Sequence, residues 1–257
     1  MTLQYCSDLH LEFSANKKFI TKHPLVPKGD VLLLAGDIMP FAVMNEHAYF
    51  FDFIADNFKQ TYWVPGNHEY YNGDIANKKL QVNEAIRSNV FLVNNDTIFL
   101  GKSRLIFSTL WSHISPTNYV TVQNRMADFS AIKYNNEAYT PDAANELHRQ
   151  CKDFITQALT NKNDQQTVVV THHIPTFLNY PAKYKRDPLN EAFAVELFDL
   201  IEQSSVDYWI YGHHHFNTPA FTIDNTQLLT NQLGYIKYKE NGGFRNDAVI
   251  EIEQAGK

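Results

Sequence analysis

Five short clusters of Asp, Asn and His residues stand out in the chain, because these side chains bind divalent cations through oxygen and imidazole nitrogen. They are Asp8-Leu9-His10, Gly36-Asp37, Gly66-Asn67-His68, Thr171-His172-His173 and Gly212-His213-His214-His215. Each cluster directly follows a short apolar segment that is typical of a β-strand. Ligand sites in α/β sheets gather at the carboxyl ends of strands, so the five clusters are predicted to converge.

Spacing within the clusters suggests which side chains act together. Residues two apart in an extended chain point to the same side, so Asp8 and His10 are predicted to hold one ion. His213 and His215 form a second pair, and His214 would point away. Taken singly, each cluster is more typical of a turn, a helix cap or a polar loop. Their joint occurrence at successive strand ends is what favours a dinuclear metal centre.

The middle clusters supply different chemistry. Asp37 has two carboxylate oxygens and can bridge two cations, and Gly36 before it permits a sharp exit from the strand. Asn67 offers a neutral amide oxygen, while the adjacent His68 can face a substrate. Glu69, or a backbone carbonyl, is expected to orient an imidazole from behind.

The apolar segments define the elements that must position these clusters. Strands are predicted at 3–6, 31–35, 61–64, 90–93, 97–100, 104–111, 167–171, 207–212 and 248–252. Helices are predicted at 45–60, 74–88 and 141–161, with a shorter one across 193–201. The closely spaced strands between residues 90 and 111 indicate an antiparallel section. This order suits a pair of mixed sheets between helices, in a single domain spanning 1–257.

Composition narrows the classes of function. The 257 residues are 44% hydrophobic and carry a net charge of −6, typical of a compact domain without general attraction for nucleic acid or anionic lipid. No apolar run reaches membrane-spanning length, and no targeting segment is visible at the N-terminus, so the cytoplasm is the expected location. Cys6 and Cys151 are predicted to be reduced core thiols.

The ordered motifs resemble those of the calcineurin-like metallophosphoesterases, D-x-H, GD, GNH[ED], H and GHxH. This chain has SDLH, AGD, PGNHE, THH and YGHHH, spanning Asp8 to His215. The runs VPGNHEYYNGD, THHIP and LNEAF resemble more narrowly a group of small bacterial phosphohydrolases. The resemblance implies a four-layer α-β-β-α sandwich with two mixed β-sheets, within the α/β class.

The resemblance also implies a role for each matching residue. One metal would be held by Asp8, His10, Asp37 and His215, and the other by Asp37, Asn67, His172 and His213. His68 would stand near the leaving group, so catalysis is assigned to His68, Asp37 and Asn67. The nitrogen and oxygen ligands suit Mn, Fe, Zn, Co or Ni without selecting one, although manganese is a fitting choice.

The implied enzyme is a metal-dependent phosphoric ester hydrolase, in which a metal-bound hydroxide attacks the phosphorus of a small substrate such as a nucleotide. Both phosphodiesters and phosphomonoesters remain open. Substrate contacts are expected from Tyr70 and from Lys183, Tyr184 and Arg186 in the irregular segment 174–190. A solvated basic loop is an equally good interpretation of that segment.

Three alternatives use the same motifs. A nuclease would need a basic groove, which the acidic composition does not favour, and a protein phosphatase would need an open site. A non-catalytic scaffold should lack Asp37, Asn67 or His68, and all three are present. The expected partner is therefore a small phosphorylated molecule, with neither membrane nor nucleic acid, and the oligomeric state is left open.

Overall fold

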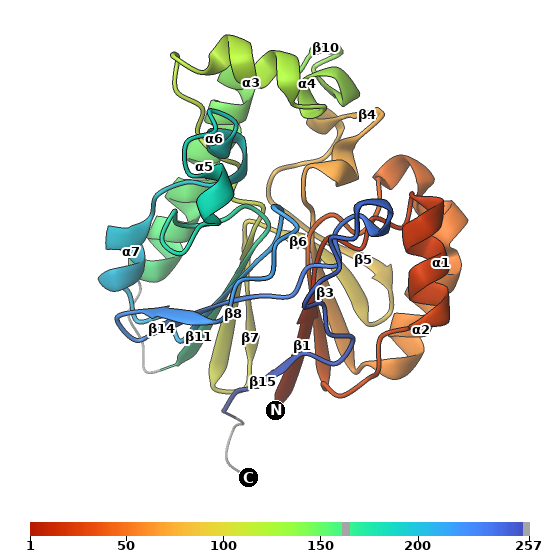
Figure 1. Ribbon diagram of the computed structural model, residues 1–257. Coiled ribbons are helices and arrows are strands. Elements are labelled where there is room, and N and C mark those ends of the chain that lie inside the picture. Colours follow the sequence, from red (N-terminus) through yellow and green to blue (C-terminus); the bar gives the residue numbers. More distant parts are fainter. Residues whose placement is uncertain (161–164, 254–257) are drawn as a thin grey trace.

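Two six-stranded mixed sheets face each other in the computed structural model, which describes residues 1–160 and 165–253 (Figure 1). The first sheet has the order β15-β1-β2-β3-β6-β5. Its strands are β1 (Thr2–Cys6), β2 (Val31–Ala35), β3 (Gln60–Val64), β5 (Val82–Arg87), β6 (Val90–Asn94) and β15 (Val249–Glu251). β1, β2, β3 and β6 run parallel, and the antiparallel β15 and β5 form the two edges.

The second sheet repeats this plan in the order β13-β14-β12-β11-β8-β7. Its strands are β7 (Asp96–Leu100), β8 (Ser103–Ser108), β11 (Gln166–Thr171), β12 (Tyr208–Tyr211), β13 (Phe221–Ile223) and β14 (Thr226–Thr230). The four inner strands are parallel, and antiparallel β7 and β13 close the edges. A small third sheet joins β4 (Gly73–Asp74), β9 (Ile132–Tyr134) and β10 (Glu137–Ala138).

Helices cover the outer faces of the sheet pair. They are α1 (Ser14–Lys22), α2 (Ala48–Asn57), α3 (Tyr119–Arg125), α4 (Asp128–Ala131), α5 (Pro141–Thr160), α6 (Asn190–Phe193) and α7 (Phe198–Glu202). Figure 1 shows α1 and α2 beside the first sheet and α5 and α7 beside the second, while α3, α4 and α6 lie at one end. Short 3-10 turns lie at Phe41–His47, His68–Tyr70, Ile75–Asn77, Ala182–Tyr184 and Ile236–Tyr238. The expected four-layer α-β-β-α sandwich is confirmed.

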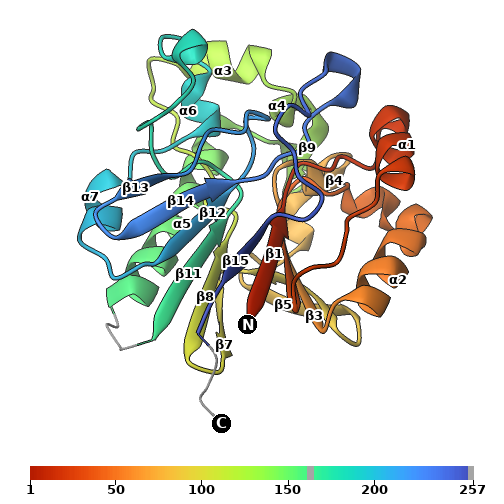
Figure 2. The same ribbon diagram turned by 60° about the horizontal axis from the view of Figure 1, so that its bottom comes forward.

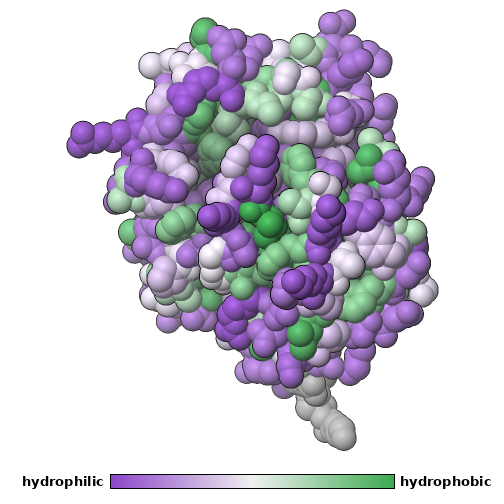
Figure 3. Space-filling model, turned by 45° about the vertical axis from the view of Figure 1, so that its right-hand side comes forward, coloured by the Kyte–Doolittle hydropathy of each residue, from purple (hydrophilic) through white to green (hydrophobic). Residues whose placement is uncertain are grey.

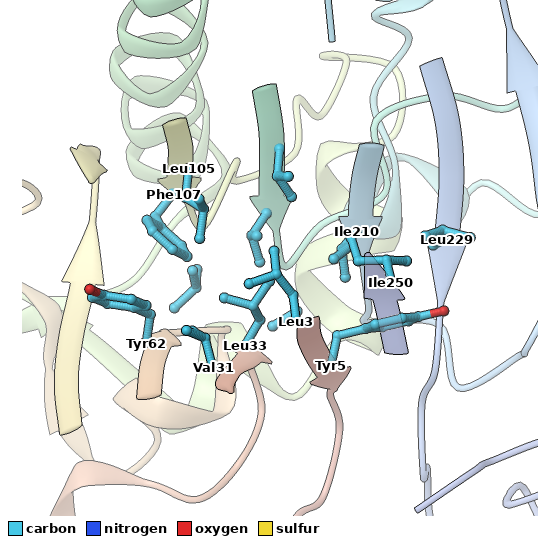
Figure 4. Close-up of a cluster of buried hydrophobic side chains, with 14 of the residues drawn as sticks. Leu3, Tyr5, Val31, Leu33, Tyr62, Leu105, Phe107, Ile210, Leu229 and Ile250 are labelled. Atoms are coloured by element: carbon cyan, nitrogen blue, oxygen red, sulfur yellow. The ribbon is translucent and has the colours of Figure 1, made fainter. Parts of the chain in front are cut away.

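The inner strands are apolar on both faces because each face packs on a different layer. Along β2, Val31, Leu33 and Ala35 belong to the core between the sheets, and Leu32 and Leu34 belong to the core under α2. Figure 4 shows side chains of the two sheets meeting in the central core. Full burial of one such side chain stabilises the fold by about 1.5–3 kcal/mol, so the sandwich forms a rigid support.

The first and last strands of the described residues pair at the edge of the first sheet. Figure 2 shows β15 lying beside β1, and Thr2 is the register partner of Glu251. The face drawn in Figure 3 is mostly hydrophilic, with apolar side chains in small patches. No helix within residues 1–160 and 165–253 combines the length and hydropathy needed to cross a bilayer.

Three predicted elements were wrong in detail. The helix predicted at 74–88 is instead a short turn followed by β5, which pairs with β6. Tertiary pairing outweighed the helix propensity of this segment. In the antiparallel section predicted between residues 90 and 111, β7 and β8 pair antiparallel as expected, but β6 and β7 belong to different sheets. The helix predicted across 193–201 is split into α6 and α7, and a bridge between Ile174 and Ala194 lies at the break.

Candidate metal centre

Seven polar side chains meet where the parallel strands of both sheets end. Asp8 and His10 follow β1, Asp37 follows β2, Asn67 follows β3, His172 follows β11, and His213 and His215 follow β12. Six of them are at most 4% exposed, so they line the floor of the site. The two sheets therefore deliver their strand ends to one place, as the carboxyl-end rule requires.

The first group of ligand atoms comes from Asp8, His10, Asp37 and His215, which lie within 4.8 Å of one another. His10 Nε2 is 2.9 Å from His215 Nε2 and 3.7 Å from Asp37 Oδ2. His215 Nε2 is 3.4 Å from Asp8 Oδ1. Two imidazoles and two carboxylates thus direct their polar atoms to one point, which is the arrangement of a cation site.

A second group lies next to the first and shares Asp37. Ligand atoms of Asp37, His172 and His213 lie within 4.8 Å of one another. His172 Nε2 is 3.1 Å from both His213 Nδ1 and Asn67 Oδ1, and 3.4 Å from Asp37 Oδ1. The two oxygens of Asp37 therefore face different groups, which is the geometry of a bridging carboxylate.

Carboxylates hold the two imidazoles of the first group from behind. His10 Nδ1 lies 3.2 Å from Glu12 Oε1, and His215 Nδ1 lies 2.7 Å from Glu240 Oε2. A proton on each Nδ1 leaves the Nε2 lone pair directed at the cluster. Histidine ligands of metals are held in this way, with the outer nitrogen bound to an acceptor.

Backbone carbonyls do the same for the second group. His172 Nδ1 lies 2.9 Å from the carbonyl oxygen of Ala35, and His213 Nε2 lies 3.2 Å from that of Ala192. His172 thus presents Nε2 and His213 presents Nδ1. Each of the four imidazoles thus has an acceptor at its outer nitrogen, which favours the neutral form whose inner nitrogen could bind a divalent ion.

Asn67 is oriented by a buried carboxylate. Its Nδ2 donates to Asp128 Oδ1 at 2.8 Å, and the Tyr71 hydroxyl donates to the same oxygen at 2.5 Å. Because the amide nitrogen is bound to Asp128, the amide oxygen of Asn67 faces the second group. Asp128 is only 5% exposed, so it is a fixed part of the site.

The backbone at the ligands is strained. Positive φ angles occur at Asp8 (56°), His10 (47°), Asp37 (54°), His213 (85°) and His215 (52°). Non-glycine residues avoid this region, and such residues cluster where function over-determines the geometry. Gly36 adds a close approach, because a Cβ there would lie 2.2 Å from His172 Nδ1.

Two buried carboxylates, Asp8 and Asp37, make the cluster a candidate site for cations. Burial alone would raise the pKa of Asp37, but His172 and His68 outweigh it and hold that pKa well below its usual value. Burial would lower the pKa of His172, but Asp37 outweighs it and raises the pKa to about 9. The two buried carboxylates have imidazoles, and neither Lys nor Arg, as their ion-pair partners among the described residues.

His68 lies above the cluster and beside the cavity. Its Nδ1 is 3.0 Å from Glu12 Oε1, and its Nε2 is 3.2 Å from the hydroxyl oxygen of Tyr235. The ring stacks on Tyr71 with a centroid distance of 4.0 Å. Burial would lower the pKa of His68, but Asp37 and Glu12 outweigh it and raise the pKa. Both ring nitrogens of His68 thus have a polar neighbour, Glu12 at Nδ1 and the Tyr235 hydroxyl at Nε2.

Glu69 does not have the role expected from the sequence. Its carboxylate accepts from the backbone N–H groups of Asp37, Ile38 and Gly66 and from Trp63 Nε1. Glu69 therefore fixes the loops after β2 and β3, and none of these donors is an imidazole. The imidazoles are oriented by Glu12, Glu240 and two carbonyls instead.

The remaining histidines of the motifs lie outside both ligand groups. His173 Nδ1 is 3.2 Å from the carbonyl oxygen of Thr109, and burial lowers the pKa of His173 to about 3. His214 contacts Gln232 and borders the cavity. Cys6 and Cys151 are buried and free, as predicted.

A cavity of about 320 Å³ opens above the two groups. Of the four residues expected to contact a substrate, Tyr184 lines this cavity. Lys183 lies over the rings of Tyr184 and Phe216, and Arg186 lines a neighbouring hollow. Tyr70 is 4% exposed and packs in an inner cluster, while the next residue, Tyr71, lines the cavity.

Four residues of the site were missed from the sequence: Glu12, Asp128, Tyr235 and Glu240. Glu12 continues the period-two series that begins at Asp8 and His10, and this signal could have identified it. Asp128 begins the short helix α4, and Tyr235 and Glu240 flank the last 3-10 turn. None of the three belongs to a motif, and only the fold brings them to the ligands.

The chain belongs to the calcineurin-like phosphoesterase family, whose model matches residues 1–217. An uncharacterized protein of Acanthamoeba polyphaga mimivirus is 32% identical over 282 aligned positions, covering 98% of this chain and 97% of the relative. The chain also resembles the crystal structure of the phosphopantetheinyl hydrolase PptH from Mycobacterium tuberculosis. That match has a TM-score of 0.66 and 18% identity, and covers 92% of this chain and 90% of PptH.

A dimetal phosphatase from Danio rerio is similar at a TM-score of 0.48 and 12% identity, over 90% of this chain and 87% of that one. Family membership makes this chain a metallophosphoesterase, and the His and Asp groups described above are its candidate metal ligands. A small phosphoester substrate is what the family implies.

Proposed function

We propose that this protein is a dinuclear-metal phosphoesterase that hydrolyses a small phosphorylated substrate, with Asp8, His10, Asp37 and His215 on one ion. Asp37, Asn67, His172 and His213 would hold the other. The observation that carries the proposal is the outer hydrogen bond on each of the four imidazoles, which leaves the inner nitrogen free for an ion.

The ligand set favours an anionic phosphate. Two divalent ions would bring four positive charges. Asp8 and Asp37 would cancel two of these, and the other five ligands are neutral when bound, so the net charge of the loaded site would be positive. Bound there, two divalent ions would supply Lewis acidity and lower the pKa of an attacking water molecule. Manganese suits the oxygen and imidazole ligands, and so do iron, zinc, cobalt and nickel.

His68 is proposed to complete the reaction. The attacking water would give one proton to the solvent as it bonds to phosphorus, and the bond from phosphorus to the alcohol oxygen would break. That oxygen would take the proton of His68 Nε2, and the solvent would then reprotonate His68. Glu12 holds the opposite nitrogen of the ring, and Tyr71 and Tyr235 fix its orientation. General acid catalysis of this kind contributes about 10²–10⁴ in rate.

The substrate is proposed to be small. The cavity above the ligands is about 320 Å³ and is bordered by α6 and by the loop that contains Tyr235 and Glu240. Its size favours a compact ester over a nucleic acid duplex or a folded phosphoprotein. Two buried free cysteines are in keeping with a reducing compartment such as the cytoplasm.

Hydrolysis of bis(4-nitrophenyl) phosphate and 4-nitrophenyl phosphate, with Mn, Ni, Zn or a chelator, tests the proposal. We expect activity that depends on metal, and a loss of both bound metal and activity in Asp37→Asn. His68→Gln should retain metal and lose at least about 100-fold in kcat. The matched control is Asp52→Asn, which changes an exposed carboxylate on α2. Hydrolysis by Asp37→Asn at the full rate in chelator would exclude the mechanism.

A further inference from the structure

The charge of the cavity wall bears on what kind of alcohol the ester carries. Among the residues described, neither Lys nor Arg lines the cavity. Besides the candidate ligand Asp37, its lining contains two carboxylates, Asp187 and Glu240. An anionic group beside Asp187 would therefore meet a like charge, with neither Lys nor Arg in the described lining to compensate it.

Most of the remaining wall is aromatic or aliphatic. Tyr71, Tyr184 and Phe193 present rings to the cavity, and Met126 and Leu189 add aliphatic surface. Sites lined in this way bind uncharged, flat or apolar groups by burying their surface. The ring of Tyr71 is fixed by its bond to Asp128, so this part of the wall is formed in advance.

The two carboxylates, Asp187 and Glu240, differ in their hydrogen-bond and ion-pair partners. Glu240 accepts from the backbone N–H of Tyr235 and contacts His215 Nδ1, so it belongs to the metal site. Asp187 accepts from the backbone N–H of Leu189 and lies 3.7 Å from Arg125, in a pair that is partly exposed on both sides. An exposed pair of this kind neutralises the carboxylate weakly. Asp187 is thus the carboxylate that a substrate group would meet.

The cations of the segment 174–190 lie outside the cavity. Lys183 rests on the rings of Tyr184 and Phe216. Lys185 and Arg186 line a neighbouring hollow, which shares Asp187 with the cavity. Asp187 therefore lies between a cavity with neither Lys nor Arg in its described lining and a hollow lined by one of each.

We propose that the cavity selects phosphoesters whose alcohol is uncharged or cationic and aromatic or apolar next to the ester, and discriminates against an anionic alcohol through Asp187. This inference rests on the proposed phosphoesterase function. It favours esters such as a nucleoside monophosphate, whose leaving group is neutral, over nucleoside di- and triphosphates, whose leaving groups are anionic.

Two aryl phosphates of equal size test the inference. In 4-(carbamoylmethyl)phenyl phosphate and 4-(carboxymethyl)phenyl phosphate the methylene group separates the variable group from the phenol, so the leaving groups have similar acidity. We expect kcat/KM of the metal-loaded protein to be on the order of tenfold higher for the amide, the size of one like-charge interaction at a partly exposed site. Asp187→Asn should narrow that ratio toward one, and Lys185→Gln should leave the ratio as it is.

A binding measurement does not depend on turnover. The two phenol products, titrated into metal-free protein and followed by saturation-transfer NMR, should rank in the same order, with the amide bound more tightly. Equal kcat/KM for the two esters, or a ratio that Asp187→Asn does not change, would overturn the inference and leave the phosphoesterase function intact. Hydrolysis of neither ester by any metal form would instead overturn the proposed function, and the inference with it.

Discussion

Asp128 provides the most specific test of how the metal centre is built. In Asp128→Ala the Nδ2 group of Asn67 loses its 2.8 Å acceptor inside the protein, and Tyr71 loses its partner too. A lost buried hydrogen bond costs about 1–3 kcal/mol. This hydrogen bond holds the amide of Asn67 in the orientation that would bind the ion shared with His172 and His213. Since about 1.4 kcal/mol corresponds to a tenfold change, that ion should bind about 10–100-fold more weakly in the variant.

The assay is equilibrium dialysis against a series of metal concentrations, with metal content measured by mass spectrometry. Wild-type protein should bind two ions per chain. Asp128→Ala should bind its first ion normally, and its second ion only at a metal concentration about 10–100-fold higher. Tyr71→Phe is the matched control, because it removes one donor and leaves the Asn67 bond in place. Two ions bound by Asp128→Ala with wild-type affinity would refute the reasoning.

Three further expectations concern stability. Metal-free protein should lose stability as the pH rises from about 6.5 to 10. Burial would lower the pKa of His172 and of His215, but nearby carboxylates outweigh burial at both residues. Asp37 raises the pKa of His172 to about 9, and Asp8 and Glu240 raise that of His215 to about 10. The stabilisation is complete below the pKa of histidine in the unfolded chain, about 6.5, and is lost as the pH passes the pKa values in the folded protein. An unfolding temperature that stays constant over this pH range in chelator would contradict the prediction. Gly36→Ala should unfold at lower urea and bind less metal, because its φ is +88° and a Cβ would lie 2.2 Å from His172 Nδ1; an unchanged urea midpoint would argue against this contact. Phe107→Ala should cost about 3–5 kcal/mol in chemical denaturation, since the ring is fully buried between the sheets; a loss under about 1 kcal/mol would mean that the core closes around it.

The sequence predicted the sheets well where the segments were short, apolar and β-branched. Val168, Val169 and Val170 in β11 are fully buried, as a strand covered on both faces requires. It failed at 74–88, where polar and helix-forming residues form the edge strand β5. An edge strand has one neighbouring strand and many exposed side chains, so its residue types give little indication that it is a strand.

Asp8 and His10 were correctly predicted to lie together, but the extended backbone on which that prediction depended is absent. The two residues lie outside β1 and both have positive φ, so a left-handed backbone brings them to one point. The prediction relied on an extended chain. Local spacing thus indicated partners without indicating the geometry.

By itself the sequence determined the chemical identity of the candidate ligands and their attachment to strand ends, because residue type and short-range periodicity are local properties. Only the tertiary structure decided which nitrogen of most imidazoles faces inward, because most of their acceptors lie in other segments of the chain. His213 meets the carbonyl of Ala192, and Asn67 meets Asp128, 61 residues away. The cavity wall is likewise assembled from separate segments, and contacts of such long range leave no periodic signal in the chain.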